Sequence, residues 1–303
     1  MNLITRSDFD GLVCAAILKD CGIIDAWTFV HPKDLQDKVI KVTENDVLAN
    51  VPYVPGCGMW FDHHSSETER VKDIEYKGES RMAKSAARIV YEYYGGKEKM
   101  PQFVEILDAV DKVDSGDLDI DEVINPTGGV LLGFVMDPRT GLGRFRDYRI
   151  SNYALMGKLI DTFRLSSISE IIEDSDIKER IDRYKEQTEL FKEMIREHSK
   201  IKGNAIVTDL RGVSAVYTGN RFLIYGMYPE SNISLWIVGG KGGQNASIAV
   251  GHSIINRTSK TDVGSLLLSY GGGGHKRVGT CQMTYNECDR ILEELISKIN
   301  ADG

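Results

Sequence analysis

Three polar side chains stand together at Asp62, His63 and His64, directly after the apolar run 58–61. This run is predicted to be a strand, so we expect the three side chains where the edge of a sheet opens into a crevice, the usual ligand site of open α/β sheets. A carboxylate beside two imidazoles can bind a divalent cation or transfer protons. Taken alone, the motif is equally typical of a polar cap on a strand end.

Further acidic residues of the first half also follow apolar segments. Asp8 and Asp10 come after a short predicted strand, and Asp111 and Asp114 lie near the end of a predicted helix. Helix capping or solvation would explain each one singly. Together with His63 they supply the carboxylate and imidazole ligands that Mn²⁺ and Mg²⁺ prefer. Such ions neutralise charge when water attacks a phosphoryl group, so the pattern predicts phosphoryl chemistry.

A glycine run at 271–274 forms a second motif, followed by His275, Lys276 and Arg277. Residues without Cβ let backbone N–H groups approach an anion, and the basic side chains offer more donors. This predicts a phosphate-binding loop, with a flexible hairpin or linker as the alternative. The candidate substrate-binding residues are Gly272, Gly273, Gly274, His275, Lys276 and, after a predicted strand, Arg257.

The elements that must position these residues follow two patterns. In the first half, short apolar strands alternate with helices, which predicts a parallel sheet covered on both faces. The expected strands are 2–5, 27–30, 46–50 and 58–61, and the expected helices are 11–21, 80–94 and 101–113. In the second half strands dominate, at 204–208, 222–225, 233–238 and 246–250, with helices at 263–269 and 287–299.

The sequence therefore predicts an α/β protein of two domains. We expect an N-terminal parallel-sheet domain over 1–160, a helical connector over 161–202 and a smaller α/β domain over 203–303. The stretch 162–202 carries charges of both signs with apolar residues at intervals of three and four, which is typical of long amphipathic helices. Its charge pattern fits a solvated face better than a dimer interface, although a homodimer remains an alternative.

Composition limits the function classes. The chain of 303 residues has a net charge of −8, which argues against coating long duplex nucleic acid. No export signal and no run of about 18 apolar residues occurs, so we expect a cytoplasmic protein without a membrane partner. Five scattered cysteines without a C-x-x-C pair indicate reduced thiols.

The motifs at 7–11, 62–64 and 272–275, with Lys276 and Gly279 following, occur in this order along the chain. In them the sequence resembles the DHH-family phosphoesterases that carry a smaller DHH-associated C-terminal domain. The resemblance covers nearly the whole chain and implies an active site in the cleft between the two domains. It also implies a Mn²⁺-dependent hydrolase of phosphodiesters or phosphoanhydrides. The family includes nanoRNA and cyclic dinucleotide phosphodiesterases, exopolyphosphatase-like enzymes and single-strand exonucleases.

The same resemblance assigns roles to residues. Asp8, Asp10 and His63 would ligate the metal, His64 would meet the scissile phosphate, and the glycine loop would hold the substrate's phosphate or terminus. The candidate metal ligands are Asp8, Asp10, His63, Asp111 and Asp46, with Asp114 as the alternative to Asp111. The candidate catalytic residues are His64, Arg6 and Asp62. The expected cofactor is Mn²⁺, with Mg²⁺ as the alternative, in one or two ions.

Two positions depart from the family pattern. Arg6 stands where family members usually place a histidine, and a guanidinium cannot ligate a metal. The family expects an aspartate at the end of the strand before Asp62, where this chain has Asn50, with Asp46 at the strand's start. Both changes remove ligands from the same metal position. We therefore predict one tightly held ion, with Arg6 replacing the charge of the other.

Two function hypotheses follow. The first is a phosphohydrolase in which metal-activated water attacks phosphorus while His64, Arg6 and the glycine loop stabilise the developing charge. Its substrate would be small, such as a short oligonucleotide, a nucleotide-like ester or a polyphosphate end, because the acidic chain has no long basic track and no obvious aromatic stacking sites. The second is a nucleotide- or phosphate-binding protein without turnover.

Overall fold

The computed structural model describes residues 1–303, apart from the side chains of Ser66 and Lys241. The chain divides into two compact units. The first comprises Met1–Asp117 and Thr127–Arg183, and the second Leu118–Pro126 and Tyr184–Gly303. The division falls inside the long helix α11 (Ser175–His198), whereas the sequence predicts a separate connector over 161–202.

The first unit is built on a sheet of five parallel strands in the order β2-β1-β3-β4-β5. The strands are β1 (Asn2–Thr5), β2 (Ala26–Phe29), β3 (Asp46–Ala49), β4 (Met59–Asp62) and β5 (Gly78–Ser80). From β1 the chain crosses to β2 on one side and later to β3 on the other. A sheet with this order has its ligand crevice outside the carboxyl ends of β1 and β3, where the winding direction reverses.

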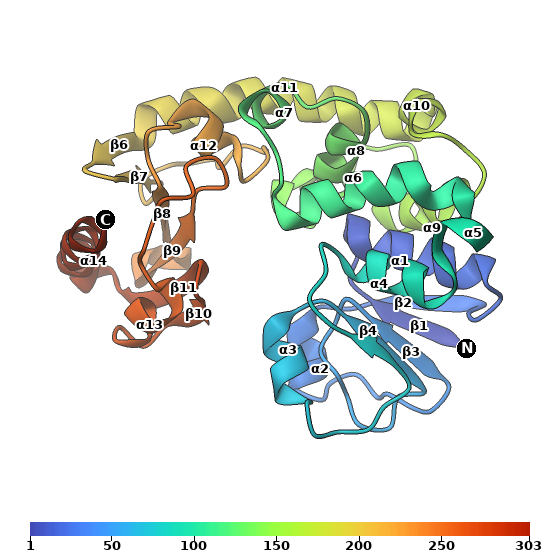
Figure 1. The fold of residues 1–303 in the computed structure, drawn as a ribbon. Helices are drawn as coiled ribbons and strands as arrows, with labels where there is room; N and C mark the ends of the chain where they lie inside the picture. Colours follow the sequence, from blue (N-terminus) through green and yellow to red (C-terminus); the bar gives the residue numbers. More distant parts are fainter. The chain divides into compact units, whose positions relative to one another are not determined.

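Helices cover both faces of this sheet (Figure 1). Ile4, Leu48 and Trp60 point to one face, where they form a core with Leu35 of α2 (Pro32–Gln36) and with Val71, which follows α3 (Ser65–Arg70). The opposite face is covered by α1 (Phe9–Asp20) and α4 (Ala86–Tyr93), and α6 (Val104–Ser115) packs beside both. The unit also contains α5 (Gly96–Lys99), α8 (Gly128–Met136), α9 (Asn152–Thr162) and α10 (Ile168–Glu173).

The second unit is built on a mixed sheet of six strands in the order β10-β11-β9-β8-β7-β6, in which only β7 and β8 pair in parallel. The strands are β6 (Ser199–Lys202), β7 (Ala205–Asp209), β8 (Ile233–Gly239), β9 (Asn245–His252), β10 (Gly273–His275) and β11 (Val278–Thr284). α13 (Val263–Leu268) and α14 (Cys288–Asp302) pack with the sheet in one apolar core. α7 (Ile120–Ile124) and α12 (Leu223–Met227) pack against each other.

The predicted mixed α/β class and the four apolar strands of the first half are confirmed. Two other predictions are wrong. Residues 222–225 were expected as a strand, but Phe222 caps α12 and the other three belong to it, because a short apolar run has no period that separates strand from helix. The predicted helix 80–94 begins only at Ala86, since Gly78–Ser80 forms β5. Within the described part of the chain, no helix combines the length and the apolar composition that a membrane span requires.

Candidate metal centre

Polar residues emerge at the carboxyl ends of three neighbouring strands. Asp8 and Asp10 follow β1, Asn50 follows β3, and His63 follows β4. The side chain of Thr5, at the end of β1, donates a hydrogen bond to the carbonyl of Ala49 at 2.8 Å and ties the ends of β1 and β3 together. The site thus lies at the edge that the strand order singles out.

Asp10, His63 and Asp114 form a cluster in which one potential ligand atom from each lies within 4.8 Å of the others. The Nε2 atom of His63 is 3.3 Å from Asp114 Oδ2 and 3.9 Å from Asp10 Oδ2. The other ring nitrogen, Nδ1, lies 3.3 Å from the carbonyl oxygen of Ala83. A proton on Nδ1 would use that carbonyl and leave the Nε2 lone pair facing the carboxylates, the usual arrangement of a metal-binding histidine.

Asp10 is almost fully buried and is fixed by the start of α4. Its carboxylate accepts hydrogen bonds from the backbone N–H groups of Ala86 (2.9 Å) and Ala87 (2.7 Å). Burial raises the pKa of Asp10 well above its ordinary value, as do the charges of Asp114 and Asp8, against the opposing effect of the two N–H groups. The cluster is therefore short of positive charge, and its donor set fits a divalent cation.

Asp8 is engaged by other partners. Its Oδ1 atom accepts hydrogen bonds from the Gly11 N–H, which caps α1, and from Asn50 Nδ2, both at 3.0 Å. Its Oδ2 atom pairs with Arg6 Nε at 3.0 Å. Asn50 adopts a left-handed backbone conformation (φ 56°), which asparagine tolerates better than most residues. A Cβ at Gly11 would lie 2.2 Å from the Arg6 carbonyl oxygen, so this turn requires glycine.

Asp62 and His64 form a pair beside the cluster. Asp62 is fully buried, and its Oδ1 atom lies 2.8 Å from His64 Nδ1. Its Oδ2 atom is buried without a hydrogen-bond partner among the described residues. Burial favours neutral His64, but the Asp62 hydrogen bond and the charges of Asp62, Asp114 and Asp10 outweigh it and raise the pKa of His64. The half-exposed imidazole is thus biased toward its charged, proton-donating form.

Besides Asp8, two further predicted metal ligands lie outside this cluster. Asp46 lies at the amino end of β3, the opposite edge of the sheet, where it accepts hydrogen bonds from Asn2 and Thr43. Asp111 accepts a hydrogen bond from Ser85 Oγ at 2.6 Å and pairs with Arg88 at 2.7 Å. Asn50 therefore occupies the strand end, and Asp114 is the helix residue that joins Asp10 and His63.

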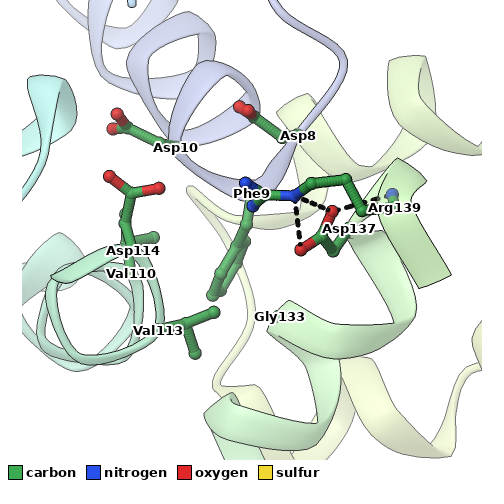
Figure 2. Close-up of a pocket in the computed structure, with 9 residues that line it drawn as sticks. All are labelled: Asp8, Phe9, Asp10, Val110, Val113, Asp114, Gly133, Asp137 and Arg139. Atoms are coloured by element: carbon green, nitrogen blue, oxygen red, sulfur yellow. Dashed lines mark hydrogen bonds and ion pairs between the residues drawn. The ribbon is translucent and has the colours of Figure 1, made fainter. Parts of the chain in front are cut away.

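Two residues that the sequence did not single out, Asp137 and Arg139, line a small pocket together with Asp8, Asp10 and Asp114 (Figure 2). They follow the buried helix α8, where Asp137 caps a short 3₁₀ turn (Pro138–Thr140) that contains Arg139. The rule that selected Asp62, a charged group directly after a buried apolar run, would also have selected Asp137. The sequence gives no sign that this turn meets Asp8.

The glycine run lies in the second unit and is ordered. Gly273–His275 form β10, an edge strand paired with β11, and Lys276 and Arg277 form the turn between the two strands. A Cβ at Gly272 or Gly274 would meet β11 at 2.5 Å or less, whereas a Cβ at Gly273 would meet nothing within 4 Å. His275, Lys276 and Arg257 are exposed. Their role in substrate binding, and an active site in a cleft between the units, stay predictions.

Comparison with solved structures identifies the chain's relatives. The pGpG-specific phosphodiesterase PggH from Vibrio cholerae is 46% identical, with a TM-score of 0.87 over 100% of this chain and 99% of that chain. The chain belongs to the DHH family. This confirms the family resemblance that the three motifs indicate. No protein-family model and no curated protein matches the sequence.

More distant structures share the DHH fold. RecJ from Thermus thermophilus in complex with Mg²⁺ is 13% identical, with a TM-score of 0.53 over 98% of this chain and 49% of that chain. CDC45 from Entamoeba histolytica is 9% identical, with a TM-score of 0.51 over 98% of this chain and 94% of that chain. At these identities the likeness shows the fold alone.

Proposed function

We propose that this DHH-family chain is a metal-dependent phosphodiesterase that hydrolyses pGpG, or a closely similar linear dinucleotide, to mononucleotides. The observation that carries the reaction type is the cluster of Asp10, His63 and Asp114 at the ligand edge of the sheet. Full-length likeness to PggH supports a small nucleotide substrate.

We propose that one divalent cation, Mn²⁺ or Mg²⁺, binds at Asp10, His63 and Asp114. When bound, such a cation neutralises charge on phosphoryl oxygens and supplies nucleophilic water at neutral pH. Asp8 differs from Asp10 in that its carboxylate is paired with a cationic side chain, Arg6, besides accepting hydrogen bonds from Gly11 and Asn50. Arg6 contributes the positive charge on that side of the site.

The chain's own residues perform complementary tasks. The N–H groups of Ala86 and Ala87 hold Asp10 in place, and the Ala83 carbonyl orients the ring of His63. Asp62 holds His64 through Nδ1, which leaves Nε2 as the atom that donates a proton to a phosphoryl oxygen or to the leaving group. As the sequence predicts, the glycine loop of the second unit would contact a further phosphate of the substrate through backbone N–H groups.

The proposal is tested with the purified full-length chain, stripped of metal and supplied with Mn²⁺ or Mg²⁺. We expect pGpG to be cleaved faster than cyclic dinucleotides, bis-p-nitrophenyl phosphate and polyphosphate, with product separated by chromatography. Asp114→Asn should abolish this activity, because it removes a ligand from the cluster. Asp161→Asn is the control, since Asp161 pairs with Lys19 on the surface.

A different outcome would favour the second hypothesis. If pGpG binds tightly in the presence of metal but no mononucleotide is released, the chain is a binding protein. If Asp114→Asn and the control are equally active, the cluster does not carry the reaction.

A further inference from the structure

Arg139 lies in a short turn whose first residue, Asp137, binds its backbone and its side chain. Asp137 begins the turn and accepts a hydrogen bond from the Arg139 backbone N–H at 2.8 Å. The same carboxylate binds Arg139 Nε, at 2.7 Å to Oδ1 and 3.0 Å to Oδ2. Asp137 is itself buried, so it fixes the base of the guanidinium. The two terminal nitrogens make no hydrogen bond within the described part of the chain.

The guanidinium points into the metal-centre pocket. Figure 2 shows it extending from the turn toward the middle of the pocket, on the side where the carboxylates of Asp8 and Asp114 lie. Its side chain is 41% exposed, so a ligand can reach it. Burial lowers the pKa of Arg139, but the charges of Asp137, Asp8 and Asp114 raise it by a larger amount. The pKa is therefore above its ordinary value, and the group stays protonated.

Charge in the pocket limits what can enter. Four carboxylates line it, those of Asp8, Asp10, Asp114 and Asp137. A phosphodiester carries a negative charge and is repelled by them unless cations compensate. Arg6 and Arg139 are each anchored to an aspartate through Nε, but Arg139 is among the residues that line the pocket and Arg6 is not. Guanidinium groups bind phosphate through two parallel hydrogen bonds, a geometry that the terminal nitrogens of Arg139 can supply.

We propose that Arg139 binds the scissile phosphate through its terminal nitrogens and that Asp137 is the residue that positions it. The inference rests on the proposed function, because it assigns a residue to that reaction. In this arrangement Arg139 neutralises charge that develops on the phosphoryl oxygens during attack. Such a contact is stronger in the transition state than in the ground state.

The test compares Arg139→Gln, Arg139→Ala, Arg139→Lys and Asp137→Asn with wild type, using pGpG and Mn²⁺. We expect Arg139→Gln to lower kcat/KM about 100-fold or more, mostly through kcat. Lysine should recover part of the loss, because it restores charge without the planar fork. Free guanidine should increase the activity of Arg139→Ala and not that of wild type. Arg164→Gln is the matched control, since Arg164 is also anchored through Nε to an aspartate, Asp20, at 2.7 Å and is 32% exposed outside the pocket.

Binding measurements separate a phosphate contact from a structural role. Arg139→Gln should keep the wild-type melting temperature and Mn²⁺ affinity. The inference is overturned if Arg139→Gln retains kcat/KM within the range of Arg164→Gln, or if its loss is explained by weaker Mn²⁺ binding. If wild type cleaves no substrate, the proposed function fails by itself. Arg139 is then judged by calorimetry of inorganic phosphate with Mn²⁺ present, where equal affinities in wild type and Arg139→Gln would reject the contact.

Discussion

Asp111 and Asp114 lie one helical turn apart, yet Asp111 has a structural role and Asp114 a proposed chemical one. The two residues lie three apart on α6, and nothing in the sequence distinguishes them as metal ligands. In the structure, Asp111 binds Ser85 and Arg88, while Asp114 faces His63. The distinction depends on the position of α4, which is a long-range contact.

This division makes the first prediction. Asp111→Asn should cost about 1–3 kcal/mol of unfolding free energy, because it leaves a buried hydrogen-bonded ion pair incomplete. It should leave Mn²⁺ affinity near that of wild type. Asp114→Asn should weaken Mn²⁺ binding about 10-fold or more, since it removes a proposed ligand rather than a supporting group. Calorimetric metal titration and urea unfolding of both variants check this, and weaker Mn²⁺ binding in Asp111→Asn alone would reverse the assignment.

The pair of Asp62 and His64 predicts a pH dependence of stability in metal-free protein. The folded-state pKa of His64 is raised above its ordinary value of 6.5. The protonated pair therefore contributes stability that is fully present below the unfolded pKa and is lost as pH rises through the folded pKa. We expect the unfolding free energy of wild type, relative to His64→Gln, to be greatest at acid pH and to decline above pH 6.5. Urea titrations with chelator present test this, and a difference that grows with pH would contradict it.

At the scale of elements, some glycines of the run at 271–274 are required by packing, and another has open space around it. Gly272 and Gly274 lie against β11, so their lack of a side chain is required by the strand pairing. Gly273 has open space around the position of a Cβ, and its backbone does not need glycine for conformation. Its missing side chain therefore keeps the backbone accessible.

The role of β10 in substrate binding can therefore be tested by substitution. Gly273→Ala should keep the wild-type melting temperature and weaken substrate binding, because a methyl group would stand beside the N–H groups proposed to contact phosphate. Gly212→Ala is the matched control, since a Cβ there also meets nothing within 4 Å. Gly272→Ala should instead destabilise the second unit. Steady-state KM and thermal unfolding of the three variants decide the matter, and an unchanged KM in Gly273→Ala would leave the loop without a role in binding.

The elements that could be predicted from the sequence carry their own local signal. β1 to β4 are short apolar runs, and Asp10 and His63 follow two of them. β5 and β10 escaped prediction because Gly78–Ser80 and Gly273–His275 contain no apolar run and depend on a neighbouring strand. Arg139 escaped for a related reason, since only the packing of α8 beside α6 places its turn near Asp8.

At the scale of the whole chain, metal binding should appear as stability. A ligand that binds only the folded state adds about 2.7 kcal/mol at a concentration 100 times its Kd. We expect Mn²⁺ to raise the unfolding free energy of wild type by this mechanism. It should also slow amide exchange at Ala86 and Ala87, which donate to Asp10. Hydrogen exchange with and without Mn²⁺ measures both effects, and an equal response in Asp114→Asn would place the metal elsewhere.

Because Arg6 pairs with Asp8, part of the positive charge at this centre comes from the chain itself and not from a bound ion. A positive charge carried by a side chain cannot be removed by a chelator, diluted by purification or exchanged for a competing cation. The charge of Asp8 is therefore balanced as soon as the chain folds, whereas the carboxylates around His63 depend on an ion from solution.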